Sequence, residues 1–312
     1  MHAERGDHGA TAADAALAMP LRLGLARFRA FVWRFHTLRL AERIFAPLSG
    51  PAIAHRRFCG YRLHLDVSRS SAQRLLLLEG ERFVGERRLV RSLLAPGMRV
   101  ADVGANIGYY LLLIESAVGP SGHVTCFEPD PQNLRELRRN VQANDLANVE
   151  VVAAAVGAGD GIVALRSGIN ALVVEDGAGD HQVPLLRLDS ALSGVVDFLK
   201  IDVEGYEGHV LAGAQRILAE QRPALWLEIH PDLLPAPHTV DEIWRVLAAH
   251  YPAPELFETS PEAGPWAKVS ARYLGRGVRR VPDPAGLLAA CRDRRRAQPF
   301  WAICRPAKRH PP

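Results

Sequence analysis

The chain has little cysteine and no long uncharged apolar run. Its 312 residues include 4 cysteines, and none of them forms a C-x-x-C pair, which disfavours a disulfide framework or a zinc site. No apolar run approaches the ~18–20 residues needed to span a bilayer. Mixed charges and Asp14 interrupt the Ala-rich start, which argues against a signal peptide. Since 48% of the residues are hydrophobic, we expect a folded protein with a sizeable core, located in the reducing cytoplasm.

Basic residues are scarce in the middle of the chain. Residues 1–61 carry 9 Lys/Arg against 4 Asp/Glu, residues 62–260 carry 17 against 27, and residues 261–312 carry 12 against 3. An enzyme that acts on nucleic acid usually places cations around its catalytic domain, because phosphate contacts dominate the affinity. The acidic middle therefore disfavours a nucleic-acid partner. The absence of an N/D-P-P-Y/F tetrapeptide near residues 198–203 points the same way.

Composition divides the chain into segments of different character. Apolar residues recur with helical spacing over residues 21–45, among many arginines. We expect this helix to pack its apolar face on the rest of the protein, and a second interpretation is peripheral contact with a membrane. The expected segments are a disordered lead (1–19), a basic amphipathic helical extension (20–60), the core (61–260), a basic insertion rich in Pro, Gly and Arg (261–298), and a last strand with a tail (299–312).

Strand-like and helix-like patterns alternate through the core. Near-continuous apolar strands separated by amphipathic helices are typical of a parallel sheet covered on both faces. The sequence therefore predicts a doubly wound α/β fold. The expected strands are 100–103, 123–129, 149–156, 198–203, 225–230, 255–260 and 300–306, and the expected helices are 131–144, 206–220 and 240–250.

The most informative stretch is VADVGANIGYY, in which an apolar strand ends in an acid and enters a glycine-spaced turn. Asp102, Gly104, Asn106 and Gly108 follow the spacing D-x-G-x-N-x-G. A dinucleotide fingerprint requires a bare backbone where Asn106 stands, so NAD is disfavoured. A ligand without phosphates fits better. S-adenosylmethionine is such a ligand, because acids can hold its ribose and backbone N–H groups at a helix start can hold its carboxylate.

Acids recur where the strands end, which is where doubly wound sheets bind ligands. Glu128 is the expected acceptor for the ribose hydroxyls, since Asp130 is the better cap for the following helix. For Asn106 we keep two interpretations, direct ligand contact or stabilisation of its own turn. Ala155 and Val156 are expected beside the adenine, or they serve packing alone.

FLKIDVEGYE is the second concentrated motif. Lys200, Asp202 and Glu204 alternate, so on a strand they share one face. We expect Lys200 to pair with an acid, and Asp202 and Glu204 to bind a ligand or take part in catalysis. His230 is a further candidate for the general base, although it also suits a local hydrogen bond. A divalent ion on Asp202, Glu204, Glu228 and His230 is an alternative that we weigh below a metal-free site.

Several motifs together resemble one family. GANIGYY, FEPDPQN, the pair Leu188-Asp189, LKIDVEGYE with its continuation VLAGA, and RPALWLEIH are similar, in order and spacing over about residues 96–231, to the FkbM family of S-adenosylmethionine-dependent methyltransferases. The resemblance implies a class I methyltransferase fold, a Rossmann-like sheet of seven strands with the last one antiparallel, which FWAICRP would supply. It also implies methylation of a hydroxyl on a small molecule or sugar.

The expected function is thus S-adenosylmethionine-dependent O-methylation by in-line methyl transfer. The alternatives are a non-catalytic or membrane-docked module that keeps the cofactor fold, and a nucleic-acid methyltransferase. The expected catalytic residues are Asp202, Glu204 and His230, without a metal. The expected cofactor-binding residues are Asp102, Gly104, Ala105, Asn106, Gly108, Tyr109, Glu128, Pro129, Ala155 and Val156.

Overall fold

The computed structural model describes six stretches of the chain. These are residues 52–79, 84–168, 171–174, 179–259, 278–292 and 298–306. All of them belong to one compact unit made of residues 48–260 and 277–312. The expected lead (1–19) and the basic helix over residues 21–45 lie outside the described residues. No helix within the described stretches combines the length and apolar character needed to cross a membrane.

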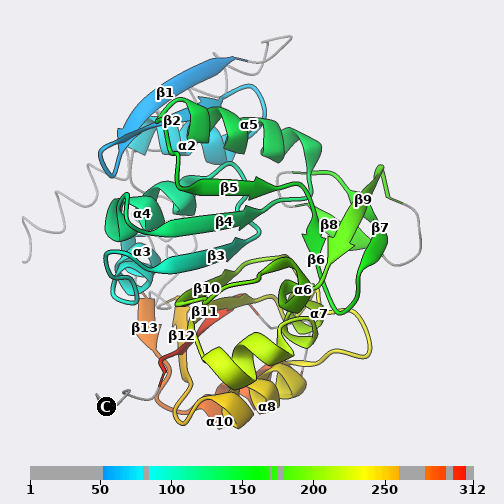
Figure 1. The fold of residues 1–312 in the computed structure, drawn as a ribbon. Helices are drawn as coiled ribbons and strands as arrows, with labels where there is room; N and C mark the ends of the chain where they lie inside the picture. The colour runs from blue at the N-terminus through cyan, green and yellow to red at the C-terminus, as the bar shows by residue number, and fades with distance from the viewer. Residues whose placement is uncertain are drawn as a thin grey trace, which may run out of the picture. The chain divides into compact units, whose positions relative to one another are not determined.

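The expected α/β fold is confirmed by the central sheet, which is mostly parallel (Figure 1). Five neighbouring strands run parallel, and the last strand inserts antiparallel beside the fifth, as the class I methyltransferase fold requires. The described sheet has eight strands rather than seven, because one short strand extends the edge. The order is β13 (Val278–Arg280), β12 (Glu255–Thr259), β14 (Phe300–Cys304), β11 (Ala224–Ile229), β10 (Phe198–Ile201), β3 (Arg99–Val103), β4 (His123–Phe127) and β5 (Val149–Val152).

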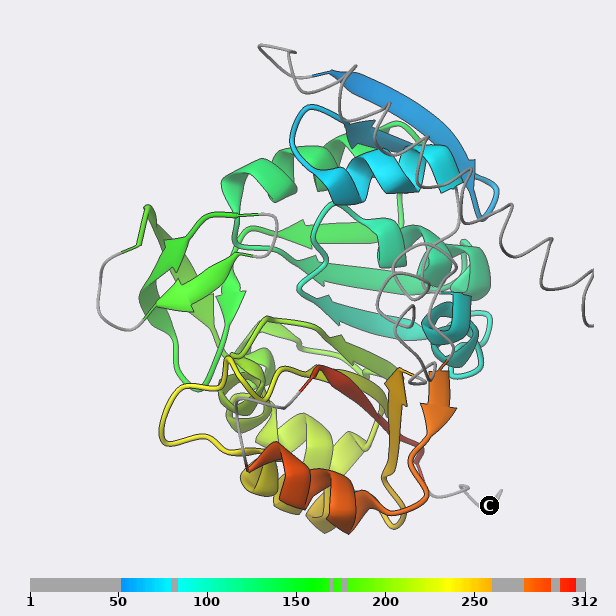
Figure 2. The ribbon, with the colours of Figure 1, turned by 180° about the vertical axis from the view of Figure 1, so that it is seen from behind.

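Helices cover the sheet in two groups, which both ribbon views show (Figures 1 and 2). In one group α3 packs on α4 and α4 on β4, and in the other α7 packs on β11 and α8, and α8 on α10. The bounds are α3 (Val84–Arg91), α4 (Tyr109–Val118), α5 (Pro131–Gln142), α6 (Leu188–Ala191), α7 (Glu207–Ala212), the π-helix η1 (Ile217–Gln221), α8 (Val240–His250) and α10 (Pro284–Cys291).

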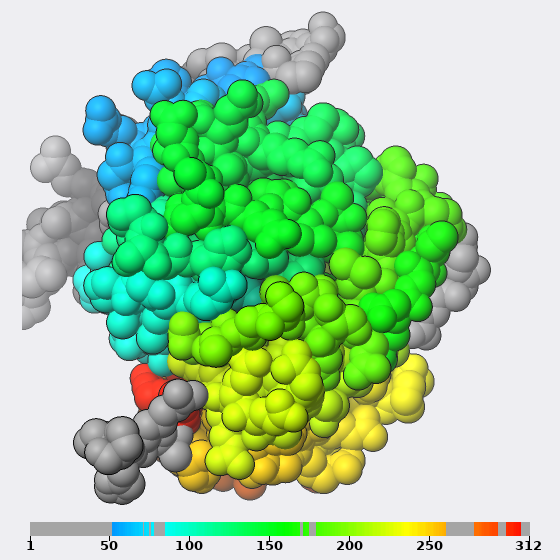
Figure 3. All heavy atoms as spheres, viewed as in Figure 1, coloured from blue at the N-terminus to red at the C-terminus, as the bar shows by residue number. Residues whose placement is uncertain are grey.

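An N-terminal hairpin and helix precede the sheet. β1 (Ile53–Phe58) pairs antiparallel with β2 (Tyr61–Asp66), and α2 (Ser71–Glu79) follows. The space-filling view shows the blue hairpin against the green surface of α5, with which β2 is in contact (Figure 3). The expected boundary at residue 61 is therefore wrong, since it would cut this hairpin at its turn.

A second sheet is formed by the chain that follows β5, at the carboxyl ends of the parallel strands of the first sheet. It contains β6 (Ala155–Val156), β9 (His181–Leu186), β7 (Gly161–Arg166) and β8 (Leu172–Val174), in that order. The expected single strand over 149–156 is wrong. β4 ends at Phe127, which lies opposite Val152 of β5. The residues after Val152 therefore have no partner strand in the main sheet, and Ala155 and Val156 pair with β9 instead.

The expected insertion over residues 261–298 is not wholly irregular. Its described part contains β13, which pairs with β12, and α10, which begins at Pro284. Proline suits the first turn of a helix, because its missing N–H would be unpaired there in any case. The strand and helix patterns of β13 and α10 were hard to recognise in the sequence because arginines and glycines surround them.

Candidate active site

Two adjoining cavities lie where β3, β4, β10 and β11 end. The larger cavity has a volume of about 400 Å³, and the smaller cavity about 100 Å³. Their position matches the general rule that α/β sheets bind ligands beyond the carboxyl ends of their strands. A ligand longer than either cavity can therefore extend through both. The residues that line both cavities are Gly104, Asn106, Asn133, Asp202 and Glu204.

The turn after β3 brings two strand ends close together. Gly104 has φ +79°, and a Cβ there would lie 1.8 Å from the carbonyl oxygen of Asp202. Only glycine fits this approach. Asn106 is also left-handed, with φ 51°, and its Oδ1 accepts the Ile107 N–H at 2.8 Å. The interpretation that Asn106 stabilises its own turn is thus confirmed, and Asn106 lines both cavities as well.

Gly108 takes a structural position. It precedes α4 with φ 90° and ψ 21°, a conformation that favours glycine. Gly108 is not among the residues that line either cavity, whereas Ala105 and Tyr109 line the larger one. Tyr109 also stacks on Phe58 of β1, with ring centroids 4.4 Å apart. This contact joins the N-terminal hairpin to the site.

Glu128 follows β4 and faces the smaller cavity. Its Oε2 accepts the Asn106 N–H at 2.8 Å, and its Oε1 accepts the Asp130 N–H at 2.9 Å. Asp130 caps α5 as expected, accepting the N–H groups of Gln132 and Asn133. Burial raises the pKa of Glu128 to about 7, against the opposing effect of these backbone donors. Both carboxylate oxygens keep lone pairs for a ligand.

Apolar residues form the rest of the smaller cavity. Pro129, Ala155 and Val156 line it, as do Leu165 and Val173 of the second sheet. Sequence patterns placed the first three there but missed the last two, because β7 and β8 carry no motif. A flat aromatic ring fits such a surface.

Asp102 and Lys200 form a buried ion pair beneath the cavities. Lys200 Nζ lies 2.9 Å from Asp102 Oδ1 and donates to the Gly104 carbonyl at 3.3 Å. Burial raises the pKa of Asp102, and Lys200 opposes that shift. The expected pairing of Lys200 is confirmed. Asp102 is not among the residues that line either cavity, so its contact is with Lys200.

The expected strand over residues 198–203 is shorter than its pattern. β10 ends at Ile201, and Glu204 has φ 47° in the following turn. Lys200, Asp202 and Glu204 therefore do not share one strand face. The turn instead brings the Glu204 carboxylate to His230, with Oε2 3.4 Å from Nε2.

His230 is surrounded by carboxylates. Its Nδ1 lies 2.7 Å from Oε1 of the buried Glu207, and its Nε2 lies 3.8 Å from Oε1 of Glu228. Burial alone would lower the pKa of His230, but the hydrogen bond and charge of Glu207, with the charge of Glu204, raise it to about 10. His230 is thus a cation near neutral pH and has no free lone pair with which to accept a proton.

The pKa values of the acids next to His230 are raised. Burial raises the pKa of Glu204 to about 7, with His230 opposing the shift. Burial and the charge of Asp202 raise the pKa of Glu228 to about 8. Acids with such values exchange protons near neutral pH. Sequence reasoning missed Glu207, although it lies three residues after Glu204 in the DVEGYE motif.

Other residues of the larger cavity carry no sequence motif. Arg69 and Ser70 come from the segment between β2 and α2, Gln73 from the first turn of α2, and Trp301 from β14. They are far from the motifs along the chain, and only the folded sheet brings them there.

Comparison with known proteins identifies the central part of the chain. Residues 102–251 match the model of the methyltransferase FkbM domain. The chain carries a methyltransferase FkbM domain. The motifs DVGANIGYY, FEPDPQN, LKIDVEGYE and LWLEIH all fall within it.

Curated proteins that are similar to this chain align with it over short stretches. An arsenite methyltransferase of Halobacterium salinarum is 40% identical over 57 residues, 18% of this chain and 15% of the relative. A protein-L-isoaspartate O-methyltransferase of Methanothrix thermoacetophila is 37% identical over 59 residues, 19% and 28% of the two chains. The chain thus spans less than a third of each relative's length.

A solved structure of methyltransferase FkbM from Methylobacillus flagellatus is similar at 17% identity, with a TM-score of 0.40. The alignment covers 70% of this chain and 50% of that one.

Proposed function

We propose that the protein is an S-adenosylmethionine-dependent methyltransferase that methylates a hydroxyl of a small molecule or sugar. The observation that carries this proposal is the pair of adjoining cavities, which share five lining residues. Glu128, an acid placed to bind a ribose, lines the smaller cavity, and Glu204, an acid with a pKa of about 7, lines the larger one. When bound, the cofactor supplies a methyl group on a sulfonium, for in-line displacement by the acceptor oxygen.

The cofactor's adenosine is assigned to the smaller cavity. Glu128 would accept hydrogen bonds from the ribose hydroxyls, and Pro129, Ala155 and Val156 would flank the adenine. Ala105 and Asn106, in the turn before α4, and Tyr109, the first residue of α4, would face the other end of the cofactor. Gly104 allows the close approach of the β3 and β10 ends that shapes this passage. Asp102 and Gly108 act indirectly, by holding Lys200 and the start of α4.

We assign the general base to Glu204. Its pKa of about 7 allows it to take the hydroxyl proton as the oxygen attacks the methyl group. Asp202 lines the same cavity, and its charge favours the cationic cofactor. His230 is a positioning residue, because its Nδ1–H faces Glu207 and its Nε2–H faces Glu204.

The proposed mechanism uses no metal. Asp202, Glu204 and His230 each offer a ligand atom, all within 4.8 Å of one another, and these atom types suit a divalent ion. A protonated imidazole cannot be a ligand, however, so an ion would have to displace the His230 proton. Activity that survives exhaustive chelation would support the metal-free mechanism, and loss of activity that a divalent ion restores would overturn it.

The charges of the larger cavity favour an uncharged acceptor. Asp202, Glu204, Glu228 and Glu86 line it, while its cations Lys200, His230 and Arg69 already face carboxylates. A phosphate-bearing acceptor such as nucleic acid would be repelled. Incorporation of labelled methyl groups into bulk tRNA or DNA would contradict this assignment. A cytoplasmic location is a separate proposal, and so is membrane contact of residues 21–45. Liposome co-sedimentation of the protein with and without residues 1–51 tests the membrane contact.

Cofactor binding tests the proposal. We expect S-adenosylhomocysteine to bind in isothermal titration calorimetry, and Glu128→Gln to weaken it about 10- to 100-fold by removing a charged acceptor of two hydrogen bonds. Glu150→Gln, on β5 with a side chain 61% exposed, is the matched control and should bind as the unchanged protein does. No binding to the unchanged protein, or equal binding by Glu128→Gln, would reject the cofactor site. Binding without methyl transfer to any hydroxyl acceptor would favour the non-catalytic module.

A further inference from the structure

One corner of the larger cavity lies outside the matched FkbM domain and has an unused polar atom. Gln73, in the first turn of α2, lines the cavity and is 6% exposed. Its Oε1 is buried and makes no hydrogen bond to any residue that the structure describes. Buried amide oxygens are normally paired. Rotation about the last side-chain torsion, which has a broad minimum, can turn this oxygen to a bound donor.

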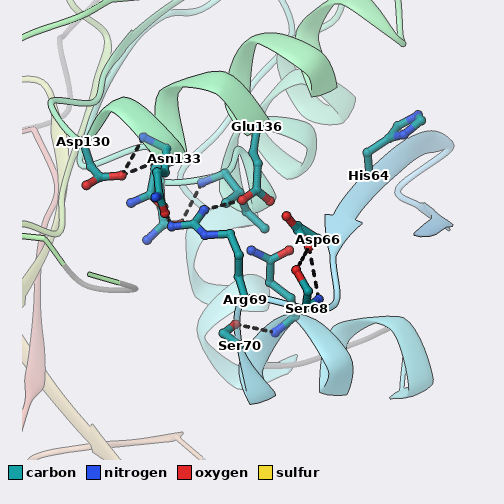
Figure 4. A network of polar contacts seen from close by, with 12 residues as sticks. His64, Asp66, Ser68, Arg69, Ser70, Asp130, Asn133 and Glu136 are labelled. Atoms are coloured by element: carbon teal, nitrogen blue, oxygen red, sulfur yellow. Dashed lines mark hydrogen bonds and ion pairs between the residues drawn. The ribbon is translucent and has the colours of Figure 1, made fainter. Parts of the chain in front are cut away.

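A cation stands beside Gln73. Arg69 lines the same cavity and donates to Glu136 and to Asn133 Oδ1, the latter at 3.3 Å. Figure 4 shows its side chain crossing from the β2–α2 segment to these two residues of α5. A guanidinium has five N–H donors, and these two bonds occupy only part of them. Arg69 is therefore placed to bind an anion as well.

The start of α2 faces the same corner. The Ser70 Oγ accepts the Gln73 N–H at 3.0 Å, as a helix cap does (Figure 4). Ser70 and Ala72 line the cavity, so the positive end of this nine-residue helix is directed to it. The corner thus offers a positive region for an anion and, one turn away, an acceptor for a cation.

We propose that this corner binds the α-amino-acid end of S-adenosylmethionine, with its carboxylate at Arg69 and the start of α2 and its ammonium at Gln73 Oε1. This inference rests on the proposed function. The path from the smaller cavity supports it. Asn133 lines both cavities, with its Nδ2 3.5 Å from Glu128 Oε1 and its Oδ1 3.3 Å from Arg69. A cofactor whose ribose lies at Glu128 therefore reaches Arg69 with its other end.

The inference extends the cofactor site beyond residues 102–251. The segment between β2 and α2, together with α2, then forms one wall of that site. The preceding strand β2 is fixed to α5 by Asn140, whose Oδ1 accepts the His64 N–H at 2.7 Å. Cofactor affinity would depend on a segment that precedes the Gly104 turn by about thirty positions, counted from Gln73.

Two ligands separate this corner from the rest of the site. S-adenosylhomocysteine carries the amino-acid end, whereas 5′-deoxy-5′-methylthioadenosine has the same adenosine without it. We expect Gln73→Leu to weaken S-adenosylhomocysteine about 10- to 100-fold, the effect of a lost hydrogen bond to a charged group. Binding of methylthioadenosine should change by less than about twofold, which also shows that the variant is folded. Gln73→Glu should keep the affinity for S-adenosylhomocysteine, because it restores an acceptor.

Gln132→Leu is the matched control, since Gln132 is exposed on α5, and it should leave both ligands unchanged. Equal losses of both ligands in Gln73→Leu, or no loss of either, would overturn the inference. Binding of methylthioadenosine as tightly as S-adenosylhomocysteine by the unchanged protein would overturn it while leaving the proposed function standing. If the unchanged protein binds neither ligand, both proposals fail.

Discussion

The two cavities are built by different physical means. In the smaller cavity, fixed backbone N–H groups hold the Glu128 carboxylate, which is 3% exposed. In the larger cavity, Glu204 and His230 are held by charges that face one another at 3.4 Å, and the Glu204 side chain is 21% exposed. Hydrogen bonds fix a geometry, whereas a balance of charges sets protonation states. The smaller cavity, the binding half of the site, is thus suited to holding a ligand, and the larger cavity, the proton-moving half, is suited to transferring a proton.

Among the substitutions that test this difference between the two cavities, replacement of Glu204 should have the largest effect. Because a positioned base contributes about 10²- to 10⁴-fold to a rate, we expect Glu204→Gln to lower kcat by about that factor. The Kd for S-adenosylhomocysteine should change by less than about threefold, since the ribose is held elsewhere. Steady-state kinetics together with calorimetry measure both quantities.

Glu220→Gln is the control for Glu204→Gln, because the Glu220 side chain is 67% exposed and Glu220 is not among the residues that line either cavity. It should leave kcat unchanged. If Glu204→Gln instead loses cofactor affinity with little change in kcat, the division of labour between the cavities is wrong, and Glu204 belongs to the binding half.

Replacement of His230 should have a smaller effect that depends on pH. The positive charge of His230 lowers the pKa of Glu204 against the effect of burial. His230→Gln removes this charge, so the pKa of Glu204 should rise above about 7 and the acid limb of the kcat profile should move to higher pH. We expect about a 5- to 15-fold loss at pH 7, because a rise of the Glu204 pKa from about 7 to roughly 8 to 8.5 lowers its ionised fraction at that pH by this factor.

This loss should recover as the pH rises, because Glu204 then ionises without its cation. His181→Gln, at an exposed position of β9, is the matched control. A pH-independent loss would show that His230 touches the acceptor directly, as the sequence analysis expected of a catalytic base.

The same contrast explains what the sequence could predict. Glu128 and the Gly104 turn are recognisable because their roles depend on residues close in the chain, within one strand–turn–helix unit. The His230–Glu207 contact joins residues 23 positions apart, and Gln73 reaches the cavity from before the first strand of the parallel sheet. Neither carries a spacing signal. The parallel sheet could be predicted from the alternation of apolar strands and helices, but the departure of β6 from the main sheet depended on where the neighbouring strand β4 ended.

The smallest expected effect concerns the smaller cavity and pH. Glu128 must be ionised to accept both ribose hydroxyls, and burial raises its pKa in the free protein to about 7. A ligand that binds the ionised form should bind more tightly as the pH rises through that value. From pH 6 to pH 8, the ionised fraction grows about 5- to 10-fold, and the affinity should rise by the same factor and then level off.

Methylthioadenosine makes this last prediction sharp, because it lacks the part that would reach the larger cavity. Calorimetry should show the same pH dependence for it as for S-adenosylhomocysteine. The dependence should persist in Glu204→Gln, whose altered group has a similar pKa, and vanish in Glu128→Gln. If it vanishes in Glu204→Gln instead, the two cavities titrate as one coupled unit, and the separation of a binding half from a proton-moving half fails.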